Sequence, residues 1–209
     1  MGPEEAPTFA GDKRPVYQRP ASFRIACRWH RPCFHPYLIS SQHLIGKEGA
    51  LVKPCSIRTF FQQDHARLDD LLVRFQTLKR SDYAEAKDRF IDFKFGLQRH
   101  IVWEEDLLFP PWEEATGLTT GGPTQVMRRE HRQIADCLEA LHKKVQAADP
   151  DSDEEEQALL TLLSSHNRKE ELILYPALDE TLSEEKRAGI FRAMNEIPEE
   201  RYKVCCADR

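Results

Sequence analysis

The chain has 209 residues, of which 40% are hydrophobic and 31% charged, and its formal net charge is −5 at pH 7. This length accommodates one domain with an appendage, and the composition is that of an ordinary globular protein. The longest apolar runs, such as ALLTLL, are far too short to cross a bilayer, so we expect no membrane partner.

The cysteines and the first residues bear on the compartment. The six thiols show no spacing typical of a disulfide framework. The stretch MGPEEAPTFAGDKRP lacks the basic start and apolar core of a secretory signal. We therefore expect a cytoplasmic protein with reduced thiols. The stretch CRWHRPCFH places two cysteines near two histidines, but the spacing matches no zinc-ligand pattern and we interpret it as coincidence (Cys27, His30, Cys33 and His35).

Residues 1–55 differ from the rest in charge and texture. They hold eight Lys and Arg against four Asp and Glu, a net charge of +4, which leaves −9 for residues 56–209. Prolines and glycines interrupt every apolar period, so we expect an irregular or disordered N-terminal arm. The acidic remainder has no dense basic stripe, which argues against nucleic acid as the main partner.

Two helices are predicted between residues 56 and 108. Apolar residues at helical intervals predict the first helix over about 56–79, with Ser56 as its N-cap. The second helix is expected over about 82–108, capped by Ser81 or Asp82 and stopped by the prolines that follow its aromatic end.

The second half of the chain repeats this pattern after the Gly-rich stretch TGLTTGGP. A third helix is predicted from about Thr124 to 149, and a fourth from an Asp151 or Ser152 cap to about Leu182. A short helix follows from Ser183 until Pro198. No stretch alternates as a strand would, so the predicted fold class is all-α. The predicted domains are an arm over 1–55, a four-helix bundle over 56–182, and a short helix and tail over 183–209.

Two segments share the same pattern of residues: HIVWEEDLLFP at 100–110 and HNRKEELILYP at 166–176. They are 66 residues apart, and the same shift places His65 on His131. In both halves the two histidines are separated by 35 residues. The chain therefore reads as two equivalent helical hairpins.

The repeated polar residues lie on the apolar stripes of their helices. Each His recurs with apolar residues at helical spacing, and each Glu follows its His by four residues, about 6 Å along the same face. Helix lengths on either side of each turn nearly cancel, which brings these residues to one height in an up-down-up-down bundle. The candidate metal ligands are His65, His100, Glu104, His131, His166 and Glu170.

Six polar groups in an apolar core require a partner, and two carboxylates side by side repel each other. A pair of cations answers both problems. Imidazole and carboxylate ligands suit iron, manganese or zinc better than calcium or copper(I). Each ion would keep positions at which oxygen or nitric oxide could bind.

Other residues near the pattern receive plainer interpretations. Glu105 and Glu171 rotate off the stripe, so we expect them to face solvent or to lie behind the ligands. His142 returns to the face of His131 three turns away, about 16 Å, and is predicted not to bind metal. Cys137 is interpreted as a small, half-buried apolar residue.

The motifs quoted above resemble the hemerythrin-like HHE cation-binding domain over about residues 57–180. The resemblance implies a four-helix bundle around an oxo-bridged, non-haem di-iron centre. Its ligands would be the six residues given above, with Glu104 and Glu170 bridging two iron ions; manganese or zinc is the less favoured alternative. No protein partner is indicated.

The pattern departs from that of oxygen-carrying hemerythrins, which use five histidines with a His-x-x-x-His pair on the third helix. Here Ala135 lies four residues after His131, and Glu170 lies four after His166. The set resembles bacterial di-iron proteins implicated in nitric oxide stress and iron–sulfur repair, although their N-terminal cysteine motif is not found in residues 1–55. We expect handling of oxygen, nitric oxide or iron in stress defence. The alternatives are a sensor or binding module without turnover, and a metal-free helical scaffold.

Overall fold

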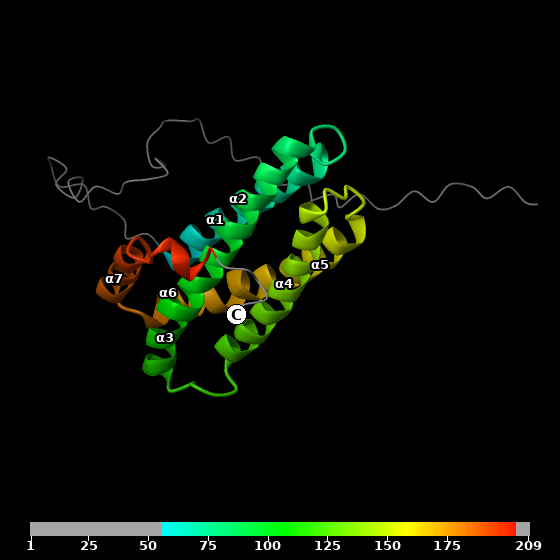
Figure 1. The fold of residues 1–209 in the computed structure, drawn as a ribbon. Coiled ribbons are helices and arrows are strands. Elements are labelled where there is room, and N and C mark those ends of the chain that lie inside the picture. The colour runs from blue at the N-terminus through cyan, green and yellow to red at the C-terminus, as the bar shows by residue number, and fades with distance from the viewer. Residues whose placement is uncertain (1–55, 204–209) are drawn as a thin grey trace, which may run out of the picture. The chain divides into compact units, whose positions relative to one another are not determined.

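The computed structural model describes residues 56–203, which form an all-helical unit (Figure 1). The α-helices are α1 (Ile57–Leu78), α2 (Tyr83–Val102), α3 (Phe109–Thr116), α4 (Pro123–Gln146), α5 (Asp153–Lys169), α6 (Tyr175–Thr181) and α7 (Glu184–Met194). Two π-helical segments, η1 (Trp103–Leu108) and η2 (Glu170–Leu174), join α2 to α3 and α5 to α6, and a 3-10 turn, η3, spans Glu199–Arg201. No strand forms between residues 56 and 203.

The predicted helical bundle is confirmed (Figure 1). Helix α1 lies along α2, and α4 lies along α5, which gives the two hairpins; α2 also packs on α4, and α1 on α6. The predicted caps act as expected at three helix starts. The Ser56 hydroxyl, the Asp82 carboxylate and the Ser183 hydroxyl each accept a hydrogen bond from a backbone N–H of the first turn.

The predicted end of the second helix is wrong. The second helix does not stop at Pro110 but continues through η1 and α3 to Thr116. The wider π turn ends where the Phe109 N–H donates to the Glu104 carbonyl, five residues back. The prolines then fall in the first turn of α3, where a missing N–H leaves no helical bond unmade.

The second hairpin contains a π-helical segment followed by a proline at the equivalent position. The Tyr175 N–H donates to the Glu170 carbonyl, again five residues back, and Pro176 follows in the first turn of α6. A sequence that ends in an aromatic residue and proline thus marks a π-helical segment in both hairpins. Both segments begin at or beside the candidate ligand Glu104 or Glu170, so the widened turn coincides with the predicted site.

Two apolar clusters lie on either side of the predicted site. We call one of them the far cluster. It lies toward the turns that join α1 to α2 and α4 to α5, and it includes Leu72, Phe90, Leu138 and Leu159. The near cluster joins α1, η1, α3, α4, η2, α6 and α7; it includes Phe61, Trp103, Met127 and Tyr175. The candidate histidines fall between these clusters, so they form a polar layer within the core.

The C-terminal part of the described chain covers the near cluster. Helix α7 ends at Met194, three residues short of the expected boundary, and the Trp103 indole N–H donates to the Met194 carbonyl at 3.3 Å. Of the helices within 56–203, none combines the length and the hydropathy needed to cross a membrane. The predicted arm over 1–55, including the group at Cys27, and the tail over 204–209 lie outside the described residues.

Candidate metal centre

The structure brings all six predicted side chains together. Each is buried, with at most 5% of its surface exposed. Their donor atoms form two overlapping groups, each compact enough to surround one ion. The His131 group comprises Glu104, His131, His166 and Glu170, and the His65 group comprises His65, His100 and Glu170. That these residues bind metal stays a prediction, but the arrangement it requires is present.

The two glutamates connect the groups. Glu170 Oε1 lies 3.0 Å from His166 Nε2, whereas its Oε2 lies 3.4 Å from His65 Nε2. Glu104 Oε2 lies 3.2 Å from His131 Nε2 and 3.8 Å from His100 Nε2. Each carboxylate therefore reaches histidines of both hairpins, as expected of a bridging ligand.

A carboxylate lies behind every histidine. Within the first hairpin, His100 Nδ1 is 3.0 Å from Asp64 Oδ2; within the second, His166 Nδ1 is 3.0 Å from Glu130 Oε2. These pairs are equivalent in the repeat. Such a carboxylate fixes the ring and leaves Nε2 directed inward, which is how histidine ligands are commonly oriented. The 66-residue shift places Asp64 on Glu130, and neither residue is among the predicted site residues.

The remaining two histidines take their carboxylates from the other hairpin. His131 Nδ1 is 2.7 Å from Glu105 Oε1, and His65 Nδ1 is 2.9 Å from Glu171 Oε1. Both glutamates lie in π-helical segments directly after a candidate ligand. The expectation that they face solvent or lie behind the ligands is therefore resolved in favour of the second position. The exchange also ties the hairpins together at the level of the site.

Contacts with carboxylates raise the pKa of two of the histidines, His65 and His131. Burial would lower the pKa of His65, but its contacts with Glu170 and Glu171 raise it to about 10. His131 behaves alike: burial opposes the shift, and contacts with Glu104 and Glu105 raise its pKa to about 9. At neutral pH the protonated rings of His65 and His131 therefore offset part of the charge of the buried carboxylates. A metal ion would have to displace these protons.

Tyr175 adds a hydroxyl to the centre that sequence analysis did not assign. Its O–H donates to Glu104 Oε1 at 2.7 Å, and Glu170 Oε2 lies 3.1 Å away. The ring is fully buried, and burial together with the two carboxylates raises the pKa of Tyr175 well above its ordinary value. The phenol is therefore a neutral donor. The signal in the sequence is the change of aromatic residue between DLLFP at 106–110 and LILYP at 172–176.

Unmatched atoms test whether an ion fits here. Within residues 56–203, three buried atoms that could bind a metal in the centre have no hydrogen-bond partner: Glu104 Oε2, His131 Nε2 and Glu170 Oε1. Glu104 Oε2 lies 3.2 Å from His131 Nε2, and Glu170 Oε1 lies 3.0 Å from His166 Nε2. Both pairs are within ion-pair distance, but neither forms a hydrogen bond. Buried polar atoms are costly when unsatisfied. All three belong to the His131 group, and a cation would satisfy them together, so the residues present fit a metal.

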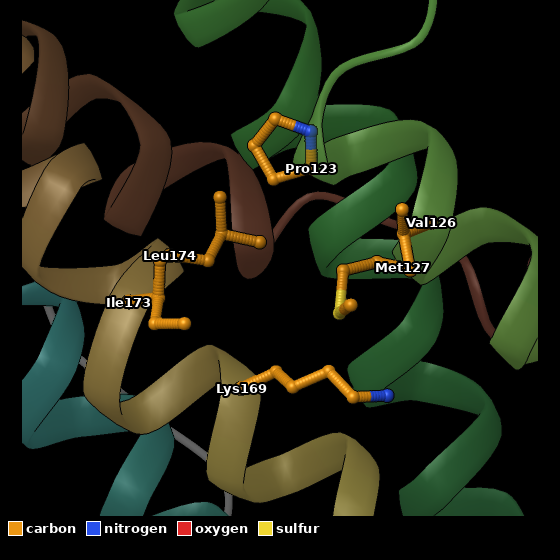
Figure 2. A pocket seen from close by; sticks show the side chains of 6 residues that line it. All are labelled: Pro123, Val126, Met127, Lys169, Ile173 and Leu174. Atoms are coloured by element: carbon orange, nitrogen blue, oxygen red, sulfur yellow. The ribbon is translucent and has the colours of Figure 1, made fainter.

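An apolar pocket of about 160 Å³ lies between the start of α4 and η2 (Figure 2). Its lining is Pro123, Val126, Met127, Lys169, Ile173 and Leu174. In Figure 2 the side chains of Val126 and Met127 face those of Ile173 and Leu174 across the pocket. Met127 precedes His131 by one helical turn, and Lys169 adjoins Glu170, so the pocket lies beside the His131 group.

Two other predicted positions stand apart from the centre. His142 contacts Glu139 at 3.4 Å and stacks on Phe90, and among the described residues it belongs to neither candidate group. Cys137 is half-buried, as predicted, and burial raises the pKa of its thiol.

Comparison with known families agrees with this geometry. The family model described as the hemerythrin HHE cation binding domain matches residues 56–178, more than half of the chain. The matched stretch contains both hairpins and all six candidate ligands. Comparisons with curated proteins and with solved structures give no match.

Proposed function

We propose that this chain, which belongs to the hemerythrin HHE cation-binding domain family, holds two iron ions and uses them to bind or turn over oxygen or nitric oxide. Cation binding is the property that defines the family. The choice of iron, the diatomic ligand and a role in stress defence are the proposal. One observation carries it: two His/Glu groups share Glu170, and one of them contains three unmatched buried atoms.

The donor set favours iron over other common ions. Four imidazoles and two carboxylates are too rich in nitrogen for calcium or magnesium, and the centre offers no thiolate for copper(I). Zinc and manganese accept similar donors and are the alternatives. Bound iron would supply one-electron redox chemistry toward a small ligand.

The chain's own residues perform three tasks in this proposal. The histidines and the two glutamates hold the ions, and the outer carboxylates of Asp64, Glu105, Glu130 and Glu171 keep the imidazoles in place. The Tyr175 hydroxyl holds a proton at the edge of the centre and donates it in a hydrogen bond to Glu104. The apolar clusters on both sides exclude water.

The surroundings favour a small uncharged ligand. The pocket beside the His131 group is lined by apolar carbon, except for Lys169, whose ammonium pairs with Glu130. A charged or extended substrate would find few polar partners there, whereas a diatomic gas needs none. This lining supports gas handling over chemistry on a large substrate.

Consumption of nitric oxide tests the proposal. Iron-loaded, reduced protein is mixed with nitric oxide under anaerobic conditions, and the free gas is followed with an electrode in the presence of excess reductant. We expect the wild-type chain to remove the gas, His166→Ala to lose this activity, and His142→Ala to retain it. Oxygen is tested in parallel in the same way. An iron-loaded chain that reacts with neither gas would contradict the proposal.

The number of equivalents separates an enzyme from a sensor. Removal of many equivalents per chain indicates turnover, whereas one stoichiometric event indicates a binding or sensor module. The unmatched atoms argue against a metal-free scaffold. In a protein that binds no metal, we would expect these buried polar atoms to have hydrogen-bond partners or to be substituted by apolar residues.

A further inference from the structure

The two halves of the centre differ in the aromatic residue that precedes the proline of each motif. A shift of 66 residues superimposes the ligands and their outer carboxylates, but it places Tyr175 on Phe109. Both rings are fully buried at the start of a helix that follows a π-helical segment. Phe109 stacks on His131, with 6.0 Å between ring centroids and 8° between the planes. Tyr175 instead brings an oxygen atom into the polar layer.

That oxygen lies on the side of the His65 group. The Tyr175 hydroxyl is 3.4 Å from both His65 Nε2 and His100 Nε2, and these two nitrogens are 3.1 Å from each other. The inward atoms of the two histidines are therefore already matched, by each other and by the phenol. An ion placed between them must displace these contacts.

The same hydroxyl orients Glu104. It holds Oε1 at 2.7 Å, while Oε2 of this carboxylate lies closer to His131 than to His100. Glu104 accordingly belongs to the His131 group and not to the His65 group. The three unmatched atoms all belong to the His131 group, and the Tyr175 hydroxyl contacts none of them.

We infer that the two metal positions are unequal: the His131 group takes up the first ion and binds it more tightly, and Tyr175 is the residue that sets this order. The inference rests on the proposed two-ion function. It assigns the first ion to a group of four donors, three atoms of which are unmatched. The second ion enters a group of three donors whose hydrogen bonds it must break.

Stepwise loading of the metal-free, full-length chain tests this order. Fe²⁺ is titrated under anaerobic conditions, and native mass spectrometry counts chains with no, one and two ions. For the wild type we expect the one-ion form to dominate at one equivalent, well beyond its share for two equal sites. Tyr175→Phe gives the second half the residue of the first half. It should strengthen the second binding step by about tenfold, because the entering ion then has one hydrogen bond fewer to displace.

Tyr83→Phe is the matched control. The Tyr83 hydroxyl donates to the Val145 carbonyl at 2.9 Å, away from the centre, and its loss should leave both binding steps unchanged. Thermal unfolding of each variant shows whether the fold is kept.

Two ligand variants identify the first position without relying on Tyr175. His100→Ala should retain one ion with the tight constant, whereas His166→Ala should retain at most one ion, bound with the weaker constant. Equal binding constants in the wild type, an unchanged gap in Tyr175→Phe, or the reverse order of the two alanine variants would overturn the inference and leave the proposed function standing. A wild-type chain that binds no ion would overturn both.

Discussion

The bundle buries charge at two levels, and the two are balanced differently. At the level of the candidate centre, carboxylates and imidazoles surround each other and three donor atoms stay unmatched. At the far end, between α1 and α5, a second polar group lies beneath the interhelical turns. We call it the lysine layer; it comprises Gln76, Lys79, Ser152, Asp153 and Glu156.

The lysine layer supplies its own cation. The Lys79 ammonium contacts Glu156 Oε1, and it lies 3.0 Å from Asp153 Oδ1 and 3.4 Å from Ser152 Oγ. The amide of Gln76 donates to Glu156 Oε2 at 3.0 Å. Both oxygens of the buried glutamate are thus matched by side chains of the chain itself.

The difference indicates where an external cation belongs. A charge that serves stability is matched by a fixed ammonium and its hydrogen bonds, as in the lysine layer. In the centre, the protons on His65 and His131 balance the charge only partly, and donor atoms that converge on a common point are left over. The chain can fold around either arrangement, but only the second has a use for a metal.

The largest expected effect comes from removing a donor of the tighter group. His131→Ala should weaken the first binding step by more than about 100-fold, beyond the loss typical of a partner that only orients a ligand. His142→Ala, on the same helix but outside both candidate groups, should leave metal content unchanged. Titration of the metal-free chain measures both. Equal losses in the two variants would show that the centre is misassigned.

In the lysine layer, the effect should fall on stability instead. Lys79→Met leaves Glu156 buried without its cation and should lower the free energy of unfolding by about 3–5 kcal/mol. Metal stoichiometry should not change. Adding Glu156→Leu should recover much of the loss, because a buried pair is often replaceable by apolar residues. Chemical denaturation measures the loss of stability. Loss of metal in a folded Lys79→Met chain would contradict the distinction between the lysine layer and the metal centre.

Acidity should weaken metal binding in the centre. Neutral imidazole binds metal, but contacts with carboxylates raise the pKa of His65 to about 10 and that of His131 to about 9. Both are therefore protonated at pH 7, and affinity should rise with pH by up to about tenfold per proton per pH unit until those values are reached. The same pairs stabilise the metal-free fold fully below the unfolded pKa near 6.5, and this contribution is lost as pH rises through 9–10.

Proton release gives the direct measurement. Titration calorimetry with Zn²⁺ near pH 7, in buffers of different ionisation enthalpy, should show that ions enter with loss of protons. Binding without any proton release would mean that the imidazoles are already neutral, which contradicts the charge balance described for the centre.

A smaller effect is expected from the outer carboxylates. Glu171→Gln keeps an oxygen near His65 Nδ1 but removes its charge, and metal affinity should fall by about tenfold. Glu114→Gln, an exposed site on α3, is the matched control. If both variants bind metal as the wild type does, Glu171 contributes only to packing between the hairpins.

Much of the bundle could be predicted because its signals are local. Ser56, Asp82 and Ser183 mark helix starts by the ordinary chemistry of capping, and the 66-residue repeat places the six candidate ligands at one height. The prediction that the second helix ends before Pro110 was wrong, because it assumed that a proline always ends a helix. The π-helical segment before it converts the proline into the first turn of a new helix.

The unpredicted residues depend on contacts between helices. Asp64 and Glu130 each look like a surface acid beside a histidine, and only the packing of a hairpin turns them toward the histidine of the neighbouring helix. Tyr175 and Phe109 both occupy the aromatic position before the proline of the repeated motif, so the pattern alone does not distinguish them. Its hydroxyl acquires a role only when the surrounding carboxylates are placed in space.

The central claim is that the polar layer between the two apolar clusters holds a pair of metal ions. The most direct test is metal content per chain, measured by mass spectrometry on full-length protein expressed with iron supplied, together with its near-ultraviolet and visible spectrum. The account predicts two irons per chain with oxo-bridge absorption. Two zinc or manganese ions would keep the site and contradict iron chemistry, whereas the absence of stoichiometric metal would contradict the account itself.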